Sequence, residues 1–168
     1  MAIKDISEYA ISEDSMSLVR LLEETLENVI ALFESHGVPL PERRYWMLGP
    51  EVPEDCAQVV VAYVQSYLGI PGDQAAEAQN CNSPRTAVLN IVITRDYPMG
   101  ERARPVSPER IMQASDWPAV DASVLSWGLN TIGSYGGMQP GPMIATVYVN
   151  APSGAVQSTV LNLSVVVP

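Results

Sequence analysis

The residue types that most often carry out catalysis are few and scattered in this chain. The single histidine is His36, and the two cysteines are Cys56 and Cys81. A Ser–His–Asp triad would have to use His36 at the end of a predicted helix, and no local motif supports either that triad or a Cys56–His36 pair. The cysteines form no CxxC motif, and a structural metal site needs more ligands than they offer. The sequence therefore predicts no catalytic residues, no metal and no cofactor.

Glycine motifs that cradle phosphate groups or present a nucleophile are also missing from the sequence. It contains no GxxxxGK[ST], GxGxxG or GxSxG pattern. The glycine-rich run at 133–137 follows a predicted helix and not a strand, so it is interpreted as a loop. Asp116 and Asp121 lie five residues apart, a spacing that places them on different faces of a helix. We therefore expect a protein that works by association and not by catalysis.

Charge is distributed very unevenly along the 168 residues, whose net charge is −10. Residues 1–55 hold twelve acids and four bases, whereas residues 122–168 hold no Asp, Glu, Lys or Arg at all. Tight binding to duplex DNA requires a cationic surface, so the acidic balance argues against it. Uncharged strands that stay exposed tend to aggregate, so residues 122–168 are predicted to be covered. The cover comes either from the chain's own helices or from neighbouring subunits, and we favour the subunits. We expect Thr159 and Leu161 of the last strand to lie in such a contact.

One basic cluster stands out against this acidic background. Arg102 and Arg104 lie in a predicted loop, with Arg95 and Arg110 close to them in sequence. The cluster is either a solvated loop or a contact for an acidic partner. The partner we consider is the glutamate face of another subunit's first helix.

Hydrophobic periodicity predicts the elements of the first two thirds of the chain. Residues 16–35 form an amphipathic helix with an acidic outer face, capped by Ser15 or Ser17. Strands are predicted at 44–48, 56–68 and 86–95, and the last alternates with Ala87, Leu89, Ile91 and Ile93 inward and Thr86, Asn90 and Thr94 outward. The long stretch 69–85 between the second and third strands is predicted to be a loop, either protruding toward a partner or disordered at its tip.

The last third of the chain is predicted to form a helical region followed by a hairpin. Ser107, Pro108 and Glu109 make a good helix start, but Pro118 should break that helix, giving a short turn and then a main helix over about 117–132. Strands at 143–150 and 155–167 are joined through 150–154. The order α-β-β-β-α-β-β predicts one α+β domain: a two-layer sandwich with a mostly antiparallel sheet of about five strands and two main helices on one face.

Taken together, these elements resemble the tail-terminator proteins of long-tailed bacteriophages. The resemblance is carried by the overall size, the helix at 16–35, the RYWMLG strand, the long strands CAQVVVAYVQSYLG and PRTAVLNIVITRDYP, and the helix–hairpin finish. The stretch from Tyr45 to Pro98 resembles head–tail connection proteins of phages that infect high-GC bacteria. The use of eight arginines against one lysine, Lys4, agrees with high-GC coding.

The resemblance implies a virion structural protein without catalytic residues. It implies a ring of about six subunits that caps the tail-tube protein and offers a docking surface to head-completion proteins. Genomic DNA would only pass through the lumen, which suits an acidic subunit, and a repeated heterologous contact would close the ring. The N-terminal segment 1–15 is mixed and acidic and shows no secretory signal. The expected location is the host cytoplasm during assembly and then the virion, with no membrane contact.

Three alternatives remain open at this point. The chain could be another neck component, such as a head-closure protein, a connector or a tube-like subunit. It could be a ligand-binding α+β dimer with a pocket lined by Trp117, Trp127 and Tyr135, although aromatic residues at helical spacing are more often core. The last alternative is an enzyme whose motif is not recognised.

Overall fold

The computed structural model describes residues 13–53, 56–72, 83–100, 105–136 and 141–167. The chain has an α+β fold in the predicted order, with one additional short helix. The elements are α1 (Glu13–Ser35), β1 (Arg44–Leu48), β2 (Gln58–Leu68), β3 (Arg85–Asp96), α2 (Pro108–Trp127), α3 (Leu129–Ile132), β4 (Met143–Val149) and β5 (Val156–Val167).

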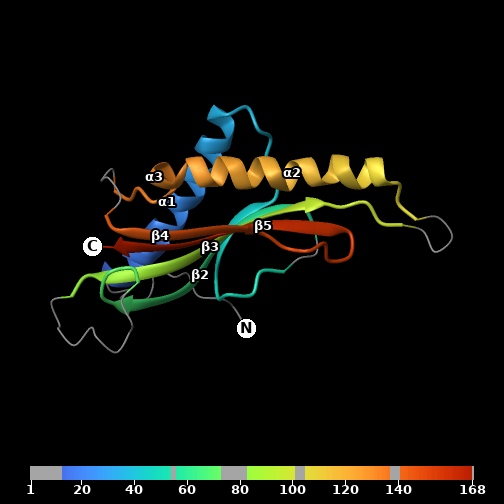
Figure 1. The fold of residues 1–168 in the computed structure, drawn as a ribbon. Helices are drawn as coiled ribbons and strands as arrows, with labels where there is room; N and C mark the ends of the chain where they lie inside the picture. The colour runs from blue at the N-terminus through green and yellow to red at the C-terminus, as the bar shows by residue number, and fades with distance from the viewer. Residues whose placement is uncertain (1–12, 54–55, 73–82, 101–104, 137–140, 168) are drawn as a thin grey trace, which may run out of the picture.

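The five strands form one mixed sheet in the order β1-β2-β3-β5-β4. The pairings β2–β3, β3–β5 and β4–β5 are antiparallel, as predicted for most of the sheet. The pairing of β1 with β2 is parallel, so the predicted, mostly antiparallel sheet contains one parallel pair at its edge. A parallel pair needs a connection that returns along the sheet, and residues 49–53 begin it on the side away from the helices (Figure 1). The side-chain amide of Gln58 donates to the Pro53 carbonyl and ties this connection to the sheet.

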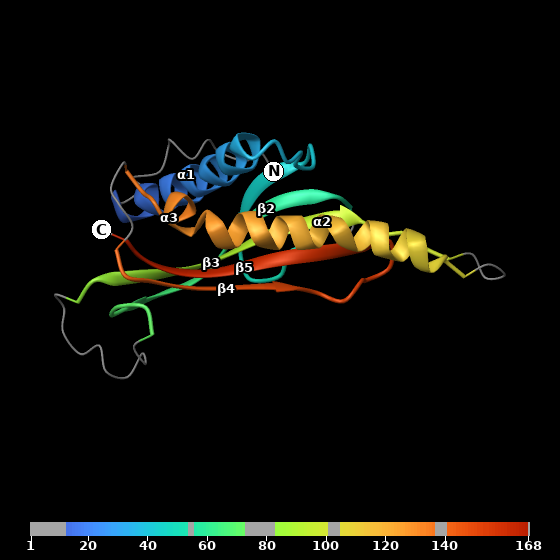
Figure 2. The same ribbon diagram turned by 45° about the horizontal axis from the view of Figure 1, so that its top comes forward.

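Both long helices cover the same face of the sheet, with α1 over the β1–β2 side and α2 over the β5–β4 side (Figures 1 and 2). The core between the two layers is a single cluster of apolar side chains, which provides the hydrophobic driving force for the fold. Its largest fully buried members are Phe33, Leu22, Leu89, Ile91, Ile93, Leu125, Ile132, Leu161 and Leu163.

The alternation predicted for the third strand is confirmed. Ala87, Leu89, Ile91 and Ile93 all belong to the core cluster. The opposite face of β3 is less open than expected, because Thr86 and Thr94 are fully buried. The Thr86 hydroxyl donates to the Gly69 carbonyl (2.6 Å), and the Thr94 hydroxyl is hydrogen-bonded to that of Ser158 (3.0 Å). The buried hydroxyl groups on this face are therefore hydrogen-bonded, Thr94 to a hydroxyl of β5 and Thr86 to a backbone carbonyl of the β2–β3 connection.

Helix α1 begins at Glu13, earlier than predicted, so the expected capping by Ser15 or Ser17 is wrong because both lie within the helix. The helix ends as predicted near Gly37, which has a φ of +67°. The amide of Val38 then donates to the carbonyl of Phe33 (3.0 Å). A residue without a Cβ takes this left-handed conformation at little cost, which explains the glycine at the helix end.

Helix α2 runs unbroken through Pro118, so the predicted break and recapping at this residue are wrong. The predicted start is confirmed: Ser107 caps the helix, and its hydroxyl accepts a hydrogen bond from the amide of Arg110 (3.4 Å). Pro118 is buried against the sheet, and its carbonyl accepts a hydrogen bond from Thr159 of β5 (3.3 Å). Packing of α2 on the sheet thus outweighs the helix hydrogen bond that proline cannot make.

The predicted main helix is divided at Gly128, where α2 ends and the short α3 begins. A Cβ added to Gly128 would lie 2.0 Å from Cδ2 of Leu32 in α1. The missing side chain therefore lets the two helices approach each other. Gly133 ends α3, as predicted for the end of the helical region.

The C-terminal hairpin is confirmed as β4 and β5 joined through 150–155. Strand β5 lies between β3 and β4, so it is an interior strand of the sheet. The predicted long loop 69–85 joins β2 to β3, and its segment 73–82 lies outside the described residues.

Candidate functional site: an internal ion pair and several exposed surfaces

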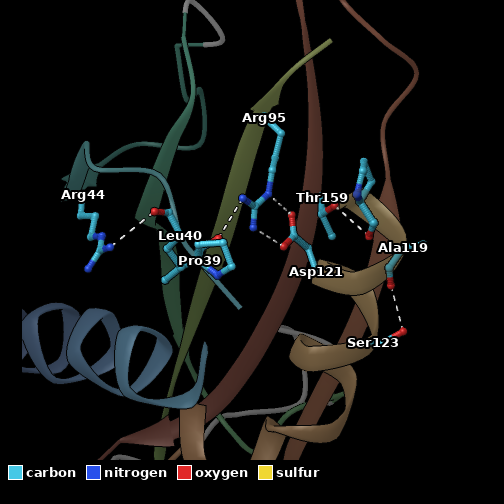
Figure 3. Close-up of polar contacts among 9 residues, drawn as sticks. Pro39, Leu40, Arg44, Arg95, Ala119, Asp121, Ser123 and Thr159 are labelled. Atoms are coloured by element: carbon cyan, nitrogen blue, oxygen red, sulfur yellow. Dashed lines mark hydrogen bonds and ion pairs between the residues drawn. The ribbon is translucent and has the colours of Figure 1, made fainter. Parts of the chain in front are cut away.

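A buried ion pair joins α2 to the sheet (Figure 3). The guanidinium of Arg95 at the end of β3 donates from Nε to Oδ2 of Asp121 (2.8 Å) and from Nη2 to Oδ1 (2.6 Å). The Asp121 side chain is 0% exposed, and that of Arg95 is 12% exposed. Two parallel hydrogen bonds from one guanidinium fix both distance and orientation.

The remaining contacts of Arg95 extend this junction to a third part of the chain. Its Nη1 donates to the carbonyl of Pro39 (2.9 Å) in the α1–β1 connection, as Figure 3 shows. Its guanidinium carbon also lies 4.7 Å from the ring centroid of Trp117, a cation–π contact. Arg95, predicted as a candidate partner contact, is therefore engaged by groups of its own chain.

Two opposing effects act on the pKa of Asp121. Burial raises the pKa of its carboxyl group above the usual value, and the hydrogen bonds and positive charge of Arg95 oppose that rise. Asp116, five residues earlier, is exposed on another face of the helix, as the spacing predicted. The pair gives α2 one fixed position on the sheet, and the sequence offered no signal for it because its members lie far apart in the chain.

A shallow groove of about 390 Å³ lies between the end of α1 and the outer side of α2. Trp127, which is 81% exposed, stands at this groove. The groove is lined by His36, Asp116, Ala119, Val120, Ser123, Val124 and Trp127. Of the three aromatic residues predicted to form a ligand pocket, only Trp127 lines it; Trp117 lies on Arg95, and Tyr135 lies beside Arg20.

The groove brings His36, Asp116 and Ser123 together, but the contacts do not form a nucleophilic relay. The hydroxyl of Ser123 donates to the carbonyl of Ala119 in its own helix (2.9 Å). Nδ1 of His36 lies 2.9 Å from the Leu32 carbonyl, in its own helix. A hydroxyl activated for attack must donate to a base, and here it donates to a helix carbonyl. Cys56 is half-buried and accepts a hydrogen bond from Arg43 (2.7 Å), whereas Cys81 lies outside the described residues.

The first half of α2 forms an exposed surface of a different kind. Residues 108–117 have no buried side chain, and the N-terminal end of the helix extends past the end of the sheet (Figures 1 and 2). It carries apolar side chains nonetheless: Met112 is 70% exposed, and Ile111 is also exposed. The basic residue Arg110 is exposed on the same half. Arg102 and Arg104 precede it and lie outside the described residues.

The two edges of the sheet are the other exposed surfaces. Among the described strands, β1 and β4 each pair with only one neighbour, so each leaves backbone donors and acceptors on its open side. Strand β4 carries no charge and exposes Ile144, Tyr148 and Val149. Strand β1 ends in Leu48, which is 61% exposed.

The predicted contact residues of the last strand are covered within the chain itself. Thr159 and Leu161 are both fully buried: Thr159 lies under α2, and Leu161 belongs to the core. The prediction that Thr159 and Leu161 lie in a subunit contact is therefore wrong, because β5 is an interior strand of the sheet. The uncharged region meets solvent instead along β4 and at Trp127.

The acidic face of α1 has one internal role. The amide of Gly136 donates to Oε2 of Glu24 (2.6 Å), and Arg20 donates to its Oε1 (2.6 Å). The hydrogen bond from Gly136 lowers the pKa of Glu24, with a smaller contribution from Arg20. Glu23, Glu27 and Glu34 are exposed and leave an acidic surface on this helix.

Within the described ranges, no cluster of three or more His, Cys, Asp or Glu side chains could hold a metal ion. No helix there is both long and apolar enough to cross a membrane. No protein-family model matches this chain, and no curated protein matches it either.

Proposed function

We propose that this protein is a virion subunit that forms a ring, of about six copies, on the end of a bacteriophage tail tube. In this role it acts as a tail terminator: it stops growth of the tube and gives head-completion proteins a surface to bind. Its partners are further copies of itself, the tail-tube protein and the head-completion proteins. Its final location is the virion.

The observation that carries this proposal is the first half of α2. None of residues 108–117 is fully buried, and Trp117 packs on Arg95 at the end of this segment. A helical segment with so little packing is only marginally stable in water. Ile111 and Met112 also expose apolar surface to solvent, and exposed apolar surface of this kind marks sites of protein–protein contact. Contact with another subunit would both cover these side chains and hold the helix in place.

The charge pattern supports the same role. The chain carries a net charge of −10, and its exposed acids include Glu23, Glu27 and Glu34 on α1. A ring with acidic subunits repels the phosphates of DNA, so DNA can pass through its lumen without adhering. The uncharged edge strand β4 and the exposed Leu48 of β1 add apolar surface that a repeated contact would bury.

The experiment for this proposal is disruption of the projecting half of α2. The variant Ile111→Glu with Met112→Glu places two charges on exposed side chains outside the core cluster, so its circular dichroism and unfolding midpoint should stay close to those of the wild type. Binding to tail tubes, measured by co-sedimentation, should be lost. The control is Asn130→Glu, which adds a charge at an exposed position of α3. Undiminished tube binding by the double variant would contradict the proposal.

The groove beside Trp127 favours a second candidate, a ligand-binding protein. Its volume of about 390 Å³ and its exposed indole suit a small molecule with an apolar ring. A thermal-shift screen with metabolites separates the candidates. Stabilisation that is lost in Trp127→Ala would favour ligand binding, whereas a ring subunit should show none.

A further inference from the structure

Strands β4 and β1 form the two edges of the sheet. Strand β4 has seven residues without a charge, and its outward side chains include the exposed Ile144 and Tyr148. Strand β1 has five residues, Arg44–Leu48, and is charged only at Arg44. Neither edge pairs with a further described strand, although Gly72 of the β2–β3 connection lies close to the Ile144 side chain of β4. An unpaired edge with little charge is a template for pairing with another strand.

Strand directions decide how the edges can meet in a ring. Since β1 runs parallel to β2, and β2–β3, β3–β5 and β5–β4 are each antiparallel, β1 and β4 run in opposite directions within one subunit. Rotation about an axis parallel to the strands preserves each direction. The β4 edge of one subunit would therefore meet the β1 edge of the next in an antiparallel pair, the more favourable arrangement.

The faces of the sheet restrict the register of this pair. In β4, Ala145 and Val147 lie on the helix-covered face, since their partners Leu163 and Leu161 belong to the core. In β1, the residue on that face is Trp46, whose partner Val61 also belongs to the core. A continuous sheet must keep its helix-covered face on one side, because a shift of one residue moves every side chain to the other face.

We propose that β4 of one subunit pairs with β1 of the next, antiparallel, so that one heterologous contact joins the sheets around the ring. In the proposed register Thr146 lies opposite Met47, Val147 opposite Trp46, and Tyr148 opposite Tyr45. The exposed Leu48 then lies over the small side chain of Ala145. Aromatic and β-branched cross-strand pairs of this kind stabilise a sheet. This inference rests on the proposed ring, which requires a heterologous contact because every subunit must face the tube in the same direction.

Cysteine cross-linking tests the contact directly. Thr146→Cys and Met47→Cys are introduced together in a chain whose Cys56 and Cys81 are replaced by serine. Within one subunit the two positions lie four strand spacings apart, roughly 19 Å, which no disulfide spans. Rings bound to tail tubes are oxidised and run on a denaturing gel without reductant. We expect a ladder of covalent oligomers that ends at the ring size.

Three controls make the result specific. Thr146→Cys alone should give no dimer, because a dimer would mean that two β4 strands pair about a two-fold axis, and that would overturn the inference. Ile144→Cys with Met47→Cys should give much less product, since those residues lie diagonally and not directly opposite; a stronger ladder from this pair would overturn the register. Thr146→Lys should prevent rings while leaving the unfolding midpoint of the monomer unchanged, and rings that persist would contradict the pairing.

The inference and the proposed function can fail separately. Rings on tube ends that yield only monomers after oxidation would refute the β4–β1 contact and leave the tail-terminator role intact. A covalent ladder from protein that ignores tail tubes would support the contact and refute that role.

Discussion

Arg95 holds the fully buried carboxylate of Asp121 through two hydrogen bonds of 2.8 and 2.6 Å, and thereby joins α2 to β3. Removing one member of a buried ion pair leaves the other without compensation, which costs roughly 3–5 kcal/mol. We therefore expect Arg95→Met to lose about this much stability in urea unfolding at neutral pH. The control Arg110→Met removes an exposed arginine and should unfold like the wild type. An Arg95→Met variant as stable as that control would show that the pair contributes nothing.

The same variant should acquire a pH dependence. Burial raises the pKa of Asp121, and without Arg95 nothing of opposite charge opposes the rise. An acid whose pKa is higher in the folded state than in the unfolded chain binds its proton more tightly when folded, so stability falls as the pH rises between those two values. Arg95→Met should therefore regain stability as the pH is lowered below neutrality, compared with the wild type at each pH. A deficit that is constant with pH would contradict this account.

The approach of α1 to the end of α2 depends on Gly128. A Cβ at this position would lie 2.0 Å from Cδ2 of Leu32, so Gly128→Ala should destabilise the protein by about 1–3 kcal/mol through overpacking. Gly141→Ala is the matched control, because its Cβ would meet Val166 at an ordinary 3.7 Å. Adding Leu32→Ala should reduce the penalty of Gly128→Ala. Equal unfolding midpoints for the two alanine variants would refute the close contact.

Lysine substitutions should distinguish the interior strand from the edge strand. Leu161 lies in the core, so Leu161→Lys buries an unpaired charge and should unfold the protein, as should Lys at the buried Thr159. Ile144→Lys makes the same kind of change at the exposed edge of β4 and should keep the native circular dichroism spectrum. If Leu161→Lys also keeps the native spectrum and unfolding midpoint, the assignment of β5 to the interior is wrong.

The basic loop gives a prediction that rests on the sequence alone. Replacing Arg102 and Arg104 with Glu reverses two charges that precede α2 in the sequence. We expect weaker subunit association in light scattering, because the loop would then repel the acidic face of a neighbouring α1. The unfolding midpoint should not change. Association equal to the wild type would indicate a solvated loop.

Local patterns predicted most of the fold correctly. The alternation of Ala87, Leu89, Ile91 and Ile93 identified the core face of β3, and Ser107 identified the start of α2. Pro118 was misjudged because its cost to the helix is local, whereas the packing that offsets it comes from β5, far away in sequence. The mostly antiparallel sheet was predicted correctly, but local patterns could not identify β1 as its one parallel strand, since strand direction depends on the path of the connection.

The candidate site was less accessible from the sequence than the fold. Arg95 was grouped with the loop arginines because it is close to them in the chain, but its partner Asp121 comes from another element. Thr159 and Leu161 were placed at a subunit contact because no charge lies near them, and that pattern does not distinguish an interior strand from an exposed edge. Strand β4 also lacks charge, but it is an edge strand with an open side. There the uncharged side chains are exposed and available for a contact with another subunit.

The most direct test of the ring is the mass of the protein, alone and with tail-tube protein from the same genome. Light scattering over a concentration series gives the subunit number, and electron microscopy shows where the protein lies. The account predicts closed rings of about six copies seated on tube ends, with tubes that stop growing once capped. A stable monomer that leaves tube length and tube ends unchanged would contradict it.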